Sequence, residues 1–133
     1  MKEVIILRGV QGSGKSTFAT LLHSMNPNSV IHETDSYFVN ENGEYVFDPT
    51  KLQENHDKNF VAFCNSIFNG VEMVIVSNVN AKKEHFDRYI NYAKLKGYKV
   101  TVLVVENHNE TKSIHDVQDY VIERTKAQFE HYL

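Results

Sequence analysis

The segment at residues 9–16 brings together the residue types that bind a chain of phosphates. It reads GVQGSGKS, fits the pattern G-x-x-x-x-G-K-[ST] in full, and is followed by Thr17. Glycines let the backbone curve so that several N–H groups point at one anion. In such a loop Lys15 reaches the β- and γ-phosphates, and the Ser16 hydroxyl is a ligand for Mg²⁺. We therefore predict that ATP and Mg²⁺ are bound through Gly9, Gln11, Gly12, Ser13, Gly14, Lys15, Ser16 and Thr17.

Asp35 is the second candidate for chemistry, because it stands just beyond a predicted strand in the run TDSYF at 34–38. A carboxylate there can accept the proton of an attacking hydroxyl or bind Mg²⁺ through water. The plain alternative is an aspartate that only stabilises a turn. Tyr37 and Phe38 have two equal interpretations, stacking on a substrate base or covering the core.

The run SNVN at 77–80 follows a third predicted strand, where an acidic Mg²⁺ partner usually stands. It offers one hydroxyl and two amides, which can hydrogen-bond a metal-bound water but bring no negative charge. This composition argues against a motor ATPase more than against a kinase.

Strand-like and helix-like segments alternate along the chain, which is typical of parallel β/α units. We expect strands at about 3–8, 29–33, 73–76 and 100–105, and helices at about 15–25, 50–69, 81–96 and 116–132. Asn80 is the expected N-cap of the third helix, and residues 36–50 are compatible with a short hairpin. The predicted fold is a single domain over 1–133. It is an α/β three-layer sandwich of the P-loop NTPase type, with about four parallel strands and helices on both faces, and ligands collect at the carboxyl ends of the strands.

Composition bounds the class of protein. The chain has 133 residues, 41% of them hydrophobic and 23% charged, with a formal net charge of −3. No apolar run approaches the roughly 20 residues of a membrane helix, and the N-terminus leads directly into the first strand, so we expect a cytoplasmic protein. Cys64 lies among apolar residues and fits the core. Residues 82–99 are locally basic, which suits either a solvated helix face or a surface that steers a polyanion.

Four blocks of the chain resemble the polynucleotide-kinase-like P-loop kinases. This group includes the kinase domain of phage polynucleotide kinase and the NEDD4-binding-protein-2-like AAA-type P-loop kinases. The similarity extends over nearly the whole chain, and its first block is the most specific. The blocks are RGVQGSGKST at 8–17, TDSYF at 34–38, VIVSNVN at 74–80 and YAKLKGYKV at 92–100.

The resemblance implies roles for particular residues. Asp35 matches the first acid of an Asp-Asp-Tyr motif, the general base for a substrate hydroxyl, whereas Ser36 replaces the second acid. The 77–80 run replaces an acid-bearing element. Lids of this family carry arginines that clamp the transferred phosphoryl group; here the 106–113 segment offers Lys112, and Arg124 matches a family arginine on the last helix. His56 falls on a family Ala-His…Asn pattern, although a half-buried structural histidine is the default.

The expected function is an ATP-binding P-loop kinase that transfers the γ-phosphoryl group to a hydroxyl, in first place a polynucleotide or nucleotide 5′-hydroxyl. Lys15, Asp35 and Arg124 are the expected catalytic residues, and Ser16 and Asp35 the expected Mg²⁺ residues. A small-molecule kinase and a catalytically weak, nucleotide-dependent binding protein remain as alternatives. The sequence leaves the acceptor and the oligomeric state open.

Overall fold

A computed structural model describes residues 1–106 of the chain, and its centre is a parallel sheet of four strands in the order β2-β3-β1-β4. The strands are β1 (Glu3–Arg8), β2 (Val30–His32), β3 (Met73–Ser77) and β4 (Lys99–Val104). Val4 is in register with Val74 on one side and with Val100 on the other. The expected number of strands and their parallel direction are confirmed.

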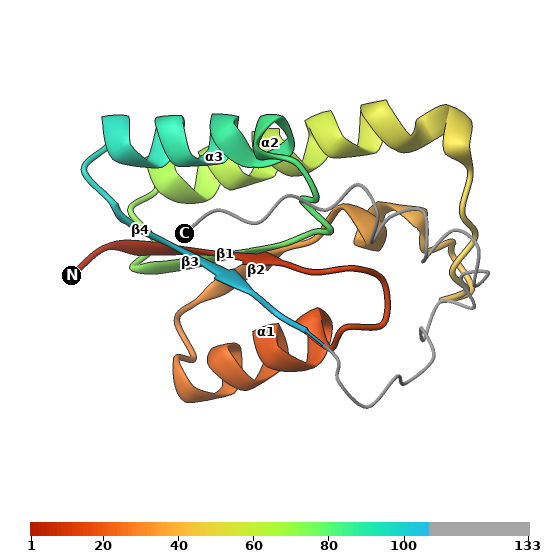
Figure 1. Cartoon of the computed structure of the whole chain (residues 1–133), viewed down its shortest axis with the longest axis horizontal. Helices are drawn as coiled ribbons and strands as arrows, with labels where there is room; N and C mark the ends of the chain where they lie inside the picture. Colours follow the sequence, from red (N-terminus) through yellow and green to blue (C-terminus); the bar gives the residue numbers. More distant parts are fainter. Residues whose placement is uncertain (107–133) are drawn as a thin grey trace.

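Helices cover both faces of this sheet (Figure 1). Helix α1 (Lys15–Met25) lies on one face, and α2 (Leu52–Phe68) and α3 (Lys83–Leu95) lie together on the other. The predicted three-layer α/β sandwich is therefore confirmed. β1 runs into a loop that leads directly into α1. This loop lies at the carboxyl edge of the sheet, which is the edge where ligands were expected.

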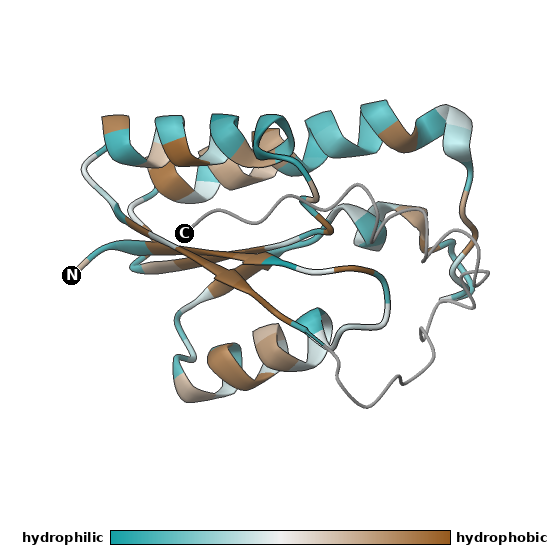
Figure 2. Ribbon diagram, in the orientation of Figure 1, coloured by the Kyte–Doolittle hydropathy of each residue, from teal (hydrophilic) through white to brown (hydrophobic). Residues whose placement is uncertain are grey.

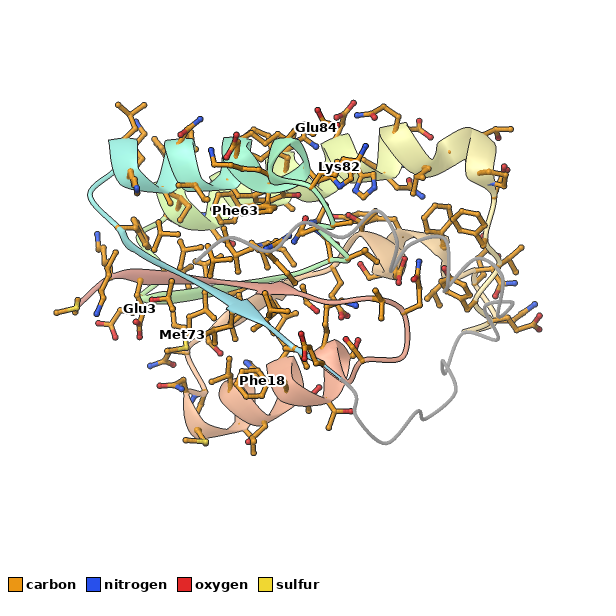
Figure 3. All side chains as sticks on the ribbon, in the orientation of Figure 1. Glu3, Phe18, Phe63, Met73, Lys82 and Glu84 are labelled. Atoms are coloured by element: carbon orange, nitrogen blue, oxygen red, sulfur yellow. The ribbon has the colours of Figure 1, made fainter. Side chains whose placement is uncertain are left out.

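The strands of the sheet consist mainly of apolar residues, as their hydropathy colouring shows (Figure 2). Its larger core faces α2 and α3, where Phe63, Tyr89 and Phe86 pack on Val4, Ile6, Val74 and Val76. The smaller core faces α1 and contains Ile5, Leu7, Ala19 and Ile75, with Phe18 and Met73 packed against it. Figure 3 labels Phe63, which belongs to the larger core, and Phe18, which packs against the smaller one. Burial on both faces explains why β1 and β3 are continuous apolar runs.

The buried face of α2 contains polar residues that the pattern of apolar residues in its sequence does not predict. Leu52, the apolar first residue of the helix, is 37% exposed, whereas Asn55 and Asn59 are 2% and 1% exposed. The Asn59 amide donates to the Tyr89 hydroxyl over 3.0 Å, which links α2 to α3. A pattern built on apolar residues misses Asn59 because its burial is supported by a hydrogen-bond partner on another helix.

The expected N-cap at Asn80 is wrong. Helix α3 begins at Lys83 with Lys82 as its N-cap, and the His85 ring accepts from the Lys82 N–H over 3.3 Å. Asn80 instead has a positive φ of 49°, and its amide donates to the Leu7 carbonyl over 3.3 Å. This residue therefore joins the loop after β3 to the end of β1, because Asn tolerates the left-handed backbone conformation.

The segment between β2 and α2 forms two short 3₁₀ helices and a tight turn. The first, η1, spans Thr34–Phe38, and the second, η2, spans Pro49–Lys51 with the Asp48 side chain accepting from the Thr50 N–H. Between them Val39 and Tyr45 form an isolated antiparallel bridge, which is a reduced form of the expected hairpin. Phe38 is 5% exposed and contacts the rings of Tyr45 and Phe47, so its core-covering interpretation is confirmed.

Several expectations lie outside the described residues. These are the helix at about 116–132, nearly all of the 106–113 segment, and the side chains of Lys112 and Arg124. Among residues 1–106, no helix combines the length and hydrophobicity needed to cross a bilayer.

Candidate functional site

The loop at residues 9–14 connects β1 to α1 and depends on its glycines. Gly12 and Gly14 have φ values of 78° and 98°, a region that side chains other than glycine rarely adopt. A Cβ built on Gly9 would stand 2.6 Å from the Val105 carbonyl oxygen and 2.4 Å from the Ser13 hydroxyl, so this position admits no side chain. The backbone is thus held in the curved form that presents N–H groups to an anion.

The N-terminus of α1 has the properties of an anion site. Its N-cap is Gly14, no side chain caps it, and its first turn contains no acidic residue. The first N–H groups of a helix lack partners within the helix and carry partial positive charge. Phosphate oxygens would provide both the hydrogen-bond acceptors and the negative charge that this end favours.

Lys15 is the first residue of this helix, and two carboxylates act electrostatically on its side chain. Its ammonium donates to the Val10 carbonyl over 3.3 Å. Burial lowers the pKa of Lys15 to about 8, although the negative charges of Asp35 and Glu33 act in the opposite direction. The structure therefore brings Lys15 and Asp35 together, as the sequence predicted for residues at the carboxyl ends of β1 and β2.

Glu33 is a component of the site that the sequence analysis missed. Its Oε1 accepts a hydrogen bond from the Ser16 hydroxyl over 2.7 Å. It was expected to be the last residue of the second strand, but β2 ends at His32 and Glu33 is the N-cap of η1. The signal that could have identified Glu33 is its acidic side chain directly after the end of β2, at the edge of the sheet where the phosphate loop lies.

Asp35 is exposed on η1 and has a second partner in Tyr45. Burial, the charge of Asp35 and a hydrogen bond with Asp35 together raise the pKa of Tyr45 to about 12. Tyr45 remains a neutral phenol at physiological pH and can donate to the carboxylate. The tight turn after η1 thus returns to the site, a contact that the sequence did not indicate.

A buried polar network fixes the position of η1. The Thr34 N–H donates to Asn78 Oδ1 over 2.9 Å, and the Thr34 hydroxyl lies 3.0 Å from His56 Nδ1. Burial, followed by the charge of Arg88, lowers the pKa of His56, so the ring is neutral at pH 7. His56 therefore has a structural partner, in agreement with its default interpretation. The amide of Asn78 has a positioning role in the loop where an acid was missing.

Arg8, the last residue of β1, stabilises the same edge of the sheet. It is 1% exposed, its guanidinium donates to the Asn80 and Ala81 carbonyls over 2.8 and 3.0 Å, and it stacks 4.7 Å from the Phe86 ring centre. A buried guanidinium needs such acceptors. It holds the loop that carries Asn78 against the end of β1.

The basic segment at 82–99 is partly occupied by local contacts. Arg88 pairs with Asp57 over 3.1 Å, donates to the His56 carbonyl over 3.1 Å and stacks 4.6 Å from the Phe60 ring centre. Lys83 pairs with Asp87 over 2.9 Å, one helical turn away. These contacts favour the solvated helix face over the phosphate-steering surface for both residues.

The donor set at this edge fits Mg²⁺. This cation prefers oxygen ligands, commonly one or two protein groups with several waters retained. The Ser16 hydroxyl and the Glu33 carboxylate are already hydrogen-bonded to each other, and the Asp35 carboxylate acts on the same Lys15 ammonium as Glu33. These oxygens suit direct or water-mediated contact with a magnesium ion.

Comparisons with known proteins agree with this geometry. A family model described as an AAA domain matches residues 4–118. NEDD4-binding protein 2 of Homo sapiens is 35% identical over 97 residues, which are 73% of this chain and 5% of that protein. The chain therefore spans only a small part of this relative's length.

Two solved structures share the fold at low identity. A chain of the Pnkp1/Rnl/Hen1 RNA repair complex superposes with a TM-score of 0.69 at 18% identity, covering 96% of this chain and 43% of that one. The APS kinase CysC of Mycobacterium tuberculosis, in complex with AMPPNP and APS, superposes with a TM-score of 0.58 at 15% identity, covering 79% and 62%. The fold is thus that of P-loop kinases, including one solved with a nucleotide analogue.

Proposed function

Because the chain belongs to this AAA-domain family of P-loop proteins, we propose that it is an ATP-dependent phosphotransferase. It would transfer the γ-phosphoryl group of ATP to a hydroxyl. The first candidate acceptor is the 5′-hydroxyl of a polynucleotide or nucleotide. The observation that carries this proposal is the grouping of Lys15, Ser16 and Asp35 at one edge of the sheet, beside an open helix N-terminus. Phosphoryl transfer requires mainly positioning and charge stabilisation, and these groups supply both.

Each residue has a defined task in this mechanism. The loop N–H groups and Lys15 would hold the β- and γ-phosphates, and Ser16 would be a protein ligand of Mg²⁺, whose charge would neutralise that of the phosphates. Asp35 accepts the proton of the acceptor hydroxyl as its oxygen bonds to the γ-phosphorus. The bond between that phosphorus and the β–γ bridging oxygen breaks, and ADP leaves with the electron pair. The exposure of Asp35 leaves it accessible to such a hydroxyl.

A small-molecule kinase is the second candidate. The net charge of −3 and the engagement of Arg88 by Asp57 both reduce the attraction of a long polyanion. A catalytically weak nucleotide-dependent binding protein is the third, favoured by the absence of a carboxylate from the 77–80 run. Arg124, the proposed phosphate clamp, and Lys112 lie outside the described residues, so their catalytic roles stay predictions.

Transfer of radiolabelled γ-phosphate tests the proposal. The acceptors are an oligonucleotide with a 5′-hydroxyl, the same oligonucleotide already carrying a 5′-phosphate, and a panel of nucleosides and sugars. We expect labelling of the 5′-hydroxyl oligonucleotide alone among the first two. Labelling confined to small acceptors would select the second candidate, and ATP binding without labelling of any acceptor would select the third.

A further inference from the structure

The end of β3 lacks the carboxylate that usually supports a magnesium site. Ser77 occupies the last position of the strand; it is 3% exposed, and its hydroxyl has no hydrogen-bond partner among the described residues. Asn78 follows, but its amide oxygen already accepts from the Thr34 N–H over 2.9 Å. Neither side chain brings negative charge to the site.

The Ser16 hydroxyl needs an acceptor for its proton, and β3 offers no carboxylate for this purpose. A hydroxyl that binds a cation through an oxygen lone pair still carries its proton, and that proton needs an acceptor. In the structure the acceptor is Glu33 Oε1, at 2.7 Å, which is the short distance expected for a charged acceptor. The Ser16 oxygen keeps its lone pairs available for the metal.

The topology of the sheet explains how β2 can supply this group. β2 and β3 are neighbours, with Val30 beside Val74 and His32 beside Val76. One residue further along these two strands come Glu33 and Ser77. The Glu33 carboxylate therefore lies one strand away from the end of β3, where a carboxylate is missing, and at the same edge of the sheet.

We propose that Glu33 is the acidic partner of the magnesium site, in place of a carboxylate on β3. It orients the Ser16 hydroxyl by accepting its proton and binds the ion through water. Asp35, two residues further on, then serves the acceptor hydroxyl rather than the metal. This inference rests on the proposed function for the presence of Mg²⁺ and ATP, but it assigns a residue and a division of labour between two carboxylates that the proposed function does not contain.

The test measures ATP affinity by isothermal titration calorimetry, with Mg²⁺ and with EDTA, for the whole chain and for Glu33→Gln. The amide keeps the size and an acceptor oxygen but loses the charge. We expect the gain in ATP affinity that Mg²⁺ confers to fall by about tenfold or more, as for other groups that orient metal ligands. Affinity in EDTA should stay equal or rise, because a negative charge near the phosphates has been removed. Glu44→Gln, in the exposed turn, is the matched control and should change neither value.

The outcomes separate the two proposals. A merely structural Glu33 would weaken ATP binding equally with Mg²⁺ and with EDTA, and an unchanged Mg²⁺ gain in Glu33→Gln would overturn this inference while leaving the proposed function intact. Absence of ATP binding by the unaltered chain would overturn both. If Glu33→Gln fails to fold, the unaltered chain with Mn²⁺ and ATP gives a second measurement. Paramagnetic broadening of the ¹³C signal of the Glu33 carboxylate, with that of Glu44 unaffected, is the supporting result, and equal broadening or none overturns it.

Discussion

The Tyr45 hydroxyl is hydrogen-bonded to Asp35, so that a turn residue holds the carboxylate proposed as the general base. The bridge between Val39 and Tyr45 and the ring contact between Phe38 and Tyr45 keep this turn folded over η1. The orientation of Asp35 therefore depends on the segment that follows it as well as on β2.

Replacing Tyr45 with phenylalanine should lower kcat by about tenfold with little change in the Kd for ATP. The phenyl ring preserves the packing, but the carboxylate loses the donor that fixes its orientation. Phosphoryl-transfer kinetics with the 5′-hydroxyl oligonucleotide measure this effect. Tyr37→Phe, at an exposed tyrosine of η1, the helix that carries Asp35, is the control and should retain the parental kcat. Parental turnover in Tyr45→Phe would show that the pair has no catalytic role.

Asp35→Asn should reduce phosphoryl transfer by ~10²-fold or more while ATP affinity changes little. The amide cannot accept the proton of the hydroxyl, but the phosphate loop is unaltered. Single-turnover rates and calorimetric ATP affinities give both quantities. Unchanged turnover would reduce Asp35 to a turn residue, and a loss of nucleotide affinity would assign it to the metal.

Gly14→Ala and Gly97→Ala form a matched pair that separates backbone strain from ligand binding. Both glycines have positive φ, at 98° and 81°, and a Cβ on either would meet no atom within 4 Å. Each substitution should lower the free energy of unfolding by about 1–2 kcal/mol, the cost of a left-handed alanine. Only Gly14→Ala should also lose ATP affinity, because Gly14 belongs to the phosphate loop and is the N-cap of α1, whereas Gly97 lies outside this loop. Equal ATP affinities in the two variants would move the nucleotide away from this loop.

The stability of the fold should fall on acidification below about pH 6.5, in part because of His32. This ring is 9% exposed and lies 2.8 Å from the Ser66 hydroxyl, and burial lowers its pKa. The unfolded chain then binds the proton more readily, so the contribution of His32 is complete above its unfolded pKa and is lost as the pH falls through the folded one. Chemical denaturation between pH 7.5 and 5 should show a smaller loss of stability in His32→Gln. An equal loss in both proteins would exclude His32 as a source.

The parts of this molecule that were predictable depend on local sequence. The phosphate loop, the four strands and the helix spans through residue 96 follow from glycine spacing and apolar periodicity within short windows. Glu33 was missed because the second strand was extended by one residue to include it. The roles of three further residues were missed because each role depends on a partner distant in sequence. Tyr45 is hydrogen-bonded to Asp35, Asn59 donates to Tyr89, and Asn80 donates to the end of β1.

Binding of ATP phosphates by residues 9–17 underlies the proposed activity and the magnesium role of Glu33, and a thermal-shift titration of the unaltered chain beside Lys15→Ala tests it most directly. With ATP and Mg²⁺ at about one hundred times Kd, a protein that binds only in its folded state gains about 2.7 kcal/mol. We predict a rise in melting temperature with ATP concentration for the unaltered chain and none for Lys15→Ala, although both fold. Equal stabilisation of the two proteins by ATP would contradict the placement of the nucleotide at this loop.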